Sequence, residues 1–175
     1  AESGKWKWIV FDIDEGLAAW ADDGFDATYN TLEIATEANG PSNLPWGRES
    51  TWPNPPWSTF VLRSLLTSQS FENLFLVTLC NLMSTNFKPE ISKQWVDEKA
   101  DLVIQEIDNH ENRWDVSGRW YIEENRSTIK NFLDDRGGHI IEHFKDFFSL
   151  SGEMNALNID LNQGGSIKIN NQIIN

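Results

Sequence analysis

Two kinds of residue are scarce in this chain, and each scarcity excludes a class of protein. Cys80 is the only cysteine among 175 residues, which excludes an intrachain disulfide framework and a cysteine-rich zinc site. Basic residues are also few, with 14 Lys and Arg against 27 Asp and Glu, and the formal net charge is −13. With no basic stripe to neutralise phosphates, nucleic acid is not an expected partner. Adsorption to an anionic membrane surface is disfavoured for the same reason.

Long apolar runs and familiar catalytic motifs are lacking as well. No apolar stretch approaches the roughly 20 residues of a membrane span, and no Gly-x-Ser-x-Gly elbow, Walker loop or catalytic Cys–His context occurs. His139, Glu142 and His143 match a short zinc-protease pattern, but no acidic residue follows them in a helical context. The simpler interpretation is an ordinary helix that carries two histidines. Cys80 falls in an apolar helical run, which predicts an inert core thiol.

Tryptophan, in contrast, is abundant, with nine copies, and two of them open the most informative stretch. Its side chains alternate, with Lys5, Lys7, Ile9, Phe11 and Ile13 on one parity and Trp6, Trp8, Val10, Asp12 and Asp14 on the other. This pattern predicts a strand from Lys5 to Asp14 with two carboxylates at the end of one face. Such carboxylates hold a hard cation such as Mg²⁺ against a phosphate. Alternatively, Asp12 and Asp14 simply open a turn.

The segment Asn39–Trp57 holds all but one of the six prolines, together with three tryptophans, Trp46, Trp52 and Trp57. We expect an ordered loop whose aromatic side chains cover a core. Sugar binding by stacking of the tryptophan faces on pyranose rings is the alternative. Before this loop, Thr28–Ala35 is expected to form a short strand.

From Ser58 onward the apolar spacing becomes helical. Ser58 is expected to cap a first helix, and the apolar run from Phe71 to Met83 predicts the central, most buried one. A third helix begins at Lys88–Pro89 and runs toward Trp114. Ser117 caps a fourth, which we expect Gly137–Gly138 to interrupt. The alternating segments Ala156–Leu161 and Ser166–Ile174, joined by Asn162–Gly165, predict a closing β-hairpin.

The order of these motifs resembles a known family. The stretches that carry the resemblance are Trp6–Asp14, Trp57–Leu66, Phe87–Glu90, Glu106–Trp114, Phe132–Arg136 and Phe148–Gly152, which runs into the hairpin. Together they resemble the C-terminal half of the spore-coat CotH family of atypical secreted protein kinases. The resemblance extends from about Lys5 to about Ile174, and it depends on the series rather than on any single motif.

The resemblance implies a metal site. Kinases of this kind hold the phosphates of ATP through Mg²⁺ or Mn²⁺ on an aspartate. In this family that aspartate opens an Asp-x-Asp-x-x-aromatic-Gly motif, onto which Asp12 and Asp14 fall as the first and third positions. Leu17 and Ala18 stand where the aromatic residue and the glycine are usual, a departure that affects how the loop is positioned.

The resemblance also implies a missing half. No nucleotide-contacting Lys and no catalytic Asp or Asn segment precedes Asp12, so we expect this chain alone to be inactive. It would be the C-terminal portion of a larger CotH-like kinase whose N-terminal lobe is its partner. An extracellular or cell-surface location follows from the resemblance only. The phosphoacceptor, a protein substrate in this family, is not identified.

The expected fold class is α+β and mostly α-helical, a helical C-lobe-like bundle in one domain over residues 1–175. Residues 1–57 would form the metal-site strand and the Trp/Pro-rich loop, residues 58–150 the helical block, and residues 154–174 the hairpin. Two other functions stay open. One is a carbohydrate- or protein-binding module that uses the Trp-rich loop, and the other is a structural component of a coat or surface.

Overall fold

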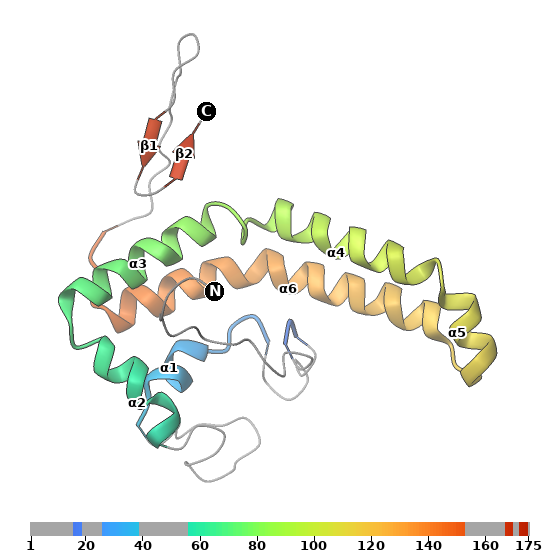
Figure 1. Cartoon of the computed structure of the whole chain (residues 1–175), viewed down its shortest axis with the longest axis horizontal. Coiled ribbons are helices and arrows are strands. Elements are labelled where there is room, and N and C mark those ends of the chain that lie inside the picture. The colour runs from blue at the N-terminus through green and yellow to red at the C-terminus, as the bar shows by residue number, and fades with distance from the viewer. Residues whose placement is uncertain (1–15, 19–25, 39–55, 153–166, 170–171, 175) are drawn as a thin grey trace, which may run out of the picture.

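The computed structural model describes residues 16–18, 26–38, 56–152, 167–169 and 172–174, and these parts are mostly helical (Figure 1). The elements are α1 (Thr31–Thr36), α2 (Pro56–Leu65), α3 (Gln69–Met83), α4 (Pro89–Ile104), α5 (Ile107–Trp114), α6 (Gly118–Phe147), β1 (Ile167–Ile169) and β2 (Gln172–Ile174). Among the described helices, none is both long enough and apolar enough to cross a bilayer.

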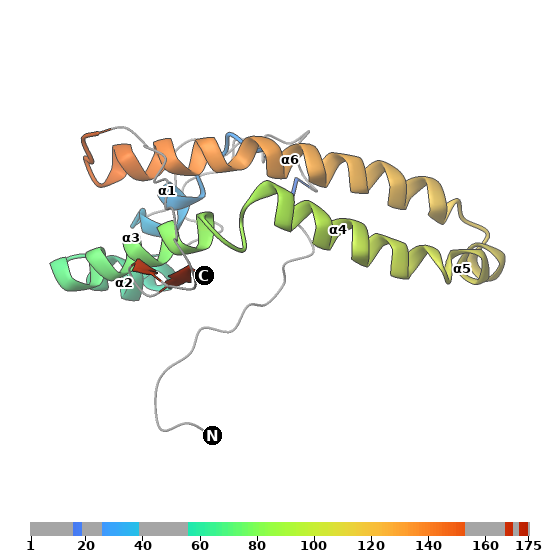
Figure 2. The same ribbon diagram turned by 90° about the horizontal axis from the view of Figure 1, so that it is seen from above.

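Two long helices, α4 and α6, lie side by side and antiparallel, and they share the most extensive contact between helices of the described residues (Figures 1 and 2). Helix α5 closes their far end, where Asp115 ends α5 in a left-handed conformation with φ 53°. The chain enters α4 through Pro89, as predicted for a first-turn proline. The buried Ser92 hydroxyl donates to the Asn86 carbonyl at 2.8 Å and ties this first turn to the preceding loop.

Helix α3 packs against the C-terminal end of α6 through aromatic rings. The ring centroid of Phe75 lies 5.8 Å from that of Phe144 and 6.2 Å from that of Phe148. Phe71 continues the stack, 6.1 Å from Phe75. Ring pairs at these separations add to the simple burial of apolar area. The aromatic side chains therefore hold the two helices together at this end.

The segment expected to be a strand at Thr28–Ala35 is instead the short helix α1, so that prediction was wrong. The Asn30 side chain accepts a hydrogen bond from the Glu33 amide at 3.2 Å and caps the helix. This Asn-x-x-Glu spacing is a helix-start signal that outweighs the β-branched residues of the segment. Thr59 then links α2 to α1, because its buried hydroxyl donates to the Glu37 carbonyl at 3.0 Å.

Three helix boundaries also differ from the predictions. Helix α2 begins at Pro56, two residues before Ser58, because proline suits a first helical turn. The helix expected to reach Trp114 ends at Ile104, and α5 follows as a separate element. Gly137–Gly138 do not interrupt α6. Each glycine costs about 1 kcal/mol relative to alanine, which a 30-residue helix tolerates.

The prediction that Phe71–Met83 is the most buried helix was wrong too. None of the residues of α3 is buried, and Cys80 is exposed rather than a core thiol. The apolar residues of α3 indicated burial but not which neighbour would supply it. Helices α4 and α6 share the more extensive contact, and α3 meets α6 at its C-terminal end. In the described parts, the buried apolar residues are only Ala27, Leu32 and Ile107. The helical block is therefore open on much of its surface.

The predicted hairpin over residues 154–174 is not confirmed. Its expected first strand, Ala156–Leu161, lies outside the described residues. The described pairing is antiparallel between β1 and β2, with Ile167 opposite Ile174 and Ile169 opposite Gln172. The segment Ser166–Ile174, expected as a single strand, thus holds both strands. Two asparagines separate them in the sequence, a residue type that favours turns.

Candidate functional site

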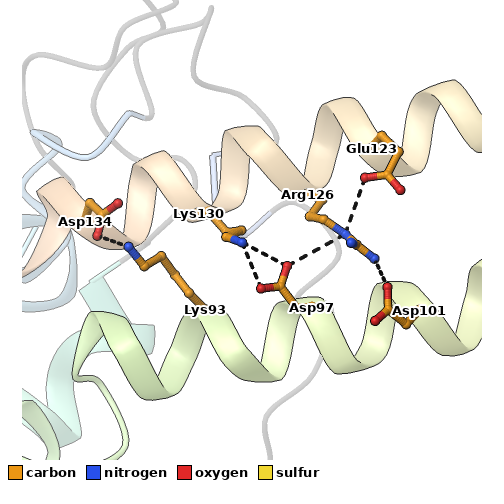
Figure 3. A network of polar contacts seen from close by, with 7 residues as sticks. All are labelled: Lys93, Asp97, Asp101, Glu123, Arg126, Lys130 and Asp134. Carbon is orange, nitrogen blue, oxygen red and sulfur yellow. Dashed lines mark hydrogen bonds and ion pairs between the residues drawn. The ribbon is translucent and has the colours of Figure 1, made fainter.

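A ladder of opposite charges joins α4 to α6 (Figure 3). Lys93 pairs with Asp134 at 2.6 Å, and Lys130 contacts the two carboxylate oxygens of Asp97 at 2.8 and 3.0 Å. Arg126 bonds to Asp101 and also lies near Asp97 and Glu123. Each step of four residues forward on α4 meets a step of four residues back on α6. This is the register of two antiparallel helices whose facing side chains repeat every turn.

The ladder perturbs the ionisation of its members. The hydrogen bond from Lys130 lowers the pKa of Asp97, and the nearby Arg126 charge acts in the same direction. The hydrogen bond to Asp101 raises the pKa of Arg126. Since the carboxylates are partly solvated, such pairs add little net stability. We infer that the ladder mainly fixes how α4 and α6 align.

Beside the ladder, an open groove of about 790 Å³ lies along α4 and α6, and residues of the preceding segments complete its lining. We call it the α4/α6 groove. Its apolar lining comprises Leu17, Met83, Phe87, Trp95, Val96, Ala100, Val103, Ile122, Ile129, Phe132, Leu133 and Ile140. Every ionisable side chain in the lining is basic, namely Lys99, Arg126 and Arg136. The groove is thus a large apolar surface, and Arg126 of its lining is already paired with carboxylates of the ladder.

Arg136 of α6 binds the segment that leads into α1. Its guanidinium donates to the Ala27 carbonyl at 2.7 Å, to the Tyr29 carbonyl at 2.6 Å and to the Thr31 hydroxyl at 2.9 Å. Burial lowers the pKa of Arg136 from its usual value, but an arginine stays charged. The three contacts span more than 100 positions of sequence. These contacts fix residues 27–31 on helix α6.

A turn at residues 16–18 brings the chain to the groove, where Leu17 is part of the lining. Leu17 and Ala18 have φ of 56° and 72°, the left-handed region that favours glycine. For residues with a Cβ atom this backbone costs about 1–2 kcal/mol each. The turn therefore stores strain next to the groove.

The two predicted metal ligands, Asp12 and Asp14, lie outside the described residues, so the metal prediction stays a prediction. Of the Trp-rich loop, the described part is Pro56–Trp57, which opens α2. His139 and His143 lie on one face of α6 with ring centroids 6.4 Å apart. Across the described ranges, no group of three or more His, Cys, Asp or Glu side chains could hold a metal ion.

Sequence reasoning missed Arg136 and the groove. Arg136 closes the Phe132–Arg136 motif, yet nothing in a single sequence says that its partners are carbonyls at residues 27 and 29. The groove depends on which faces of α4 and α6 meet. A weak signal existed, because Asp97 and Asp101 on one helix and Arg126 and Lys130 on another share the same four-residue spacing.

The arrangement defines a class of protein before it gives a family: a mostly helical block with an open apolar groove. The family model described as CotH kinase protein matches residues 1–140. The chain therefore belongs to the CotH kinase family. No curated protein and no solved structure matches it.

Proposed function

We propose that this chain is the C-terminal lobe of a CotH-like protein kinase, with Asp12 as the metal ligand and Asp14 assisting. The observation that carries the proposal is the family match over residues 1–140, which includes both acids. In the intact protein they would hold Mg²⁺ or Mn²⁺ with ATP. The strained turn at Leu17–Ala18 supports this assignment, because it has glycine-type backbone where the family motif ends in glycine.

The exposed apolar surface of the helical block is a second support. No side chain of the described residues is fully buried, and large apolar residues such as Phe60, Leu74 and Trp120 are more than half exposed. Monomeric proteins rarely leave so much apolar surface in water. A block of this kind suits packing against the N-terminal lobe of the same protein. Phosphoryl transfer needs the parts of that lobe, so the block alone would be inactive.

The test is binding of Mn²⁺–ATP and Mg²⁺–ATP to the longest natural form of the protein, measured by calorimetry. We expect Asp12→Ala to weaken binding at least about tenfold, since a carboxylate ligand to the metal is lost. Asp14→Ala should have a smaller effect. Asp108→Ala, which removes an exposed acid of α5, is the matched control and should bind normally. Equal binding by Asp12→Ala and the unmodified protein would remove the metal role.

A second candidate function is a binding module for a polysaccharide or a protein partner, and one observation favours it. Trp57 is 78% exposed on the first turn of α2. An exposed indole face can stack on a sugar ring or anchor a protein partner. Quenching of tryptophan fluorescence by a polysaccharide panel, lost in Trp57→Ala, would support this function. Tryptophan fluorescence that stays unchanged with every polysaccharide of the panel would count against sugar binding.

Three further expectations from the family resemblance belong to the same proposal. A protein would be the phosphoacceptor, the protein would be secreted to the cell surface, and it could serve there as a structural coat or surface component. Fractionation of the source cells, followed by detection of the chain in the surface fraction, tests the location. Recovery only from the cell interior would contradict it.

A further inference from the structure

A second groove lies where α4, α5 and α6 meet, at the end of the α4 and α6 pair that points away from α1, α2 and α3 (Figures 1 and 2). Its volume is about 690 Å³, and we call it the tip groove. The apolar part of its lining consists of Leu102, Val103, Ile107, Val116, Tyr121 and Ile122. The ring of Trp120 meets that of Tyr121 edge to face, with centroids 5.1 Å apart, and extends this apolar surface.

The apolar surface at the tip groove is large. Aromatic side chains carry about 150–250 Å² each, so Trp120 and Tyr121, which are 60% and 59% exposed, leave roughly 200–300 Å² in water. Leu102, Val103 and Val116 are each about half exposed and add roughly 100–200 Å². The sum of about 300–500 Å² equals the largest apolar patch of a typical monomer, and such a patch is often functional.

The tip groove also holds a carboxylate without a cationic partner among the described residues. Glu106 lines the groove, and its side chain accepts a hydrogen bond from the Asn109 amide at 3.0 Å. The two arginines of this end are engaged elsewhere, because Arg119 pairs with Asp108 and Arg113 lies over the Trp114 ring. Residues 100–122 contain no lysine. The charge of Glu106 therefore favours a partner that brings a basic side chain.

Area and charge together select the kind of partner. A second copy of this chain would bring the same carboxylate to the groove and a net charge of −13, and like charges across an interface are unfavourable. Two such patches would also bury only about 600–1,000 Å² in total, less than the roughly 1,200 Å² of stable interfaces. A single segment of another protein needs less area. Three helices build the groove, so the partner cannot add a strand to it and is recognised through side chains, as an amphipathic helix is.

We propose that the tip groove is a docking site for a basic amphipathic helix of another protein. The apolar face of that helix lies on Leu102, Val116 and Tyr121, and one of its lysine or arginine side chains pairs with Glu106. This interaction surface goes beyond the proposed function and does not depend on the metal role of Asp12.

The test uses the full chain and a fluorescein-labelled model peptide of leucine and lysine, patterned as an amphipathic helix. Fluorescence anisotropy measures its dissociation constant. The matched probe has glutamate at every lysine position, so that it keeps the apolar face and reverses the charge. The leucine–lysine peptide should bind at least about tenfold more tightly than the leucine–glutamate peptide. Equal affinities would contradict the charge preference.

Two pairs of variants locate the bound peptide. Tyr121→Ala should weaken binding of the leucine–lysine peptide at least about fivefold, since buried aromatic anchors dominate such interfaces. Phe60→Ala is the matched control, because Phe60 is also 59% exposed but lies on α2, and its affinity should stay within about twofold of the unmodified chain.

The second pair isolates the charge. Glu106→Gln keeps an acceptor for Asn109 but loses the negative charge, and it should weaken binding at least about threefold. Glu98→Gln is its control, because the Glu98 carboxylate also accepts from a side-chain amide, that of Gln94, and lies outside the groove. This control should bind within about twofold of the unmodified chain.

Three results would overturn the proposal. They are the absence of binding, equal affinity of the four variants, and a dimer of the full chain in analytical ultracentrifugation that Tyr121→Ala dissociates, which would assign the groove to a second copy. Far-ultraviolet circular dichroism checks that each variant keeps its helices. If Tyr121→Ala loses them, Leu102→Asp on the α4 wall of the groove takes its place, with the same expected loss of affinity.

Discussion

Replacing Arg136 by methionine should release the segment at residues 26–36 from α6. The guanidinium is the donor in three hydrogen bonds to this segment, to Ala27, Tyr29 and Thr31, at 2.6 to 2.9 Å. Methionine keeps the length and apolar stem of the side chain but donates nothing. The helix α1 that follows has only six residues, which is too short to persist without tertiary contacts.

The size of the effect follows from these contacts. A hydrogen bond to a charged group contributes about 1.5–3 kcal/mol, and contacts of one guanidinium are not independent. Arg136 is only partly buried, and the freed carbonyls can bond to water, so the lower part of the range applies. We expect a loss of about 2–3 kcal/mol for the ordered segment. This corresponds to a population of the open form raised about 30- to 150-fold.

Hydrogen–deuterium exchange resolves this local opening. The amides of α1, from Thr31 to Thr36, should exchange faster in Arg136→Met by about the same factor, while the amides in the middle of α4 change little. Lys145→Met is the control, because its ammonium contacts Glu142 on the same helix. Unchanged protection of α1 in Arg136→Met would refute the view that this arginine fixes the segment.

Three further predictions concern the charge ladder, the strained turn and two glycines. The hydrogen bond from Lys130 lowers the pKa of Asp97 below its usual 3.8, so its stabilising contribution is complete above about pH 4 and is lost as the pH falls further. Thermal melting between pH 7 and 2.5 should therefore show a smaller acid loss in Asp97→Asn than in the unmodified protein. Ala18→Gly relieves about 1–2 kcal/mol of strain and adds about 0.5–1 kcal/mol of chain entropy, so urea denaturation should show a gain of about 0.5 kcal/mol, and a loss would contradict the strain. Gly118→Ala should destabilise the protein by about 1–3 kcal/mol, since its new Cβ would lie 2.6 Å from Cδ1 of Ile107, the first residue of α5. Gly138→Ala, with open space around the new Cβ, should instead stabilise α6 by about 1 kcal/mol; equal effects of the two substitutions would refute this explanation.

The sequence predicted much of the helical block because its signals are local. Pro89 opens a helix as expected. The series of motifs also predicted the family, which the match over residues 1–140 confirms. The failures occurred where two local signals competed. At Asn30 the cap outweighed β-propensity, and at Gly137–Gly138 the continuing helix outweighed glycine.

The sequence by itself determined that the chain is mostly helical, acidic and a member of the CotH kinase family, since spacing, charge and motif order are properties of the chain. Only the tertiary structure decided that α4 shares the most extensive contact with α6, that Arg136 holds residues 27–31, and that an apolar groove opens beside Leu17. These features depend on which faces meet between residues that lie 25 to 109 positions apart in the sequence. Apolar periodicity shows that a helix face will be covered, but the covering partner is selected by packing and charge register in three dimensions.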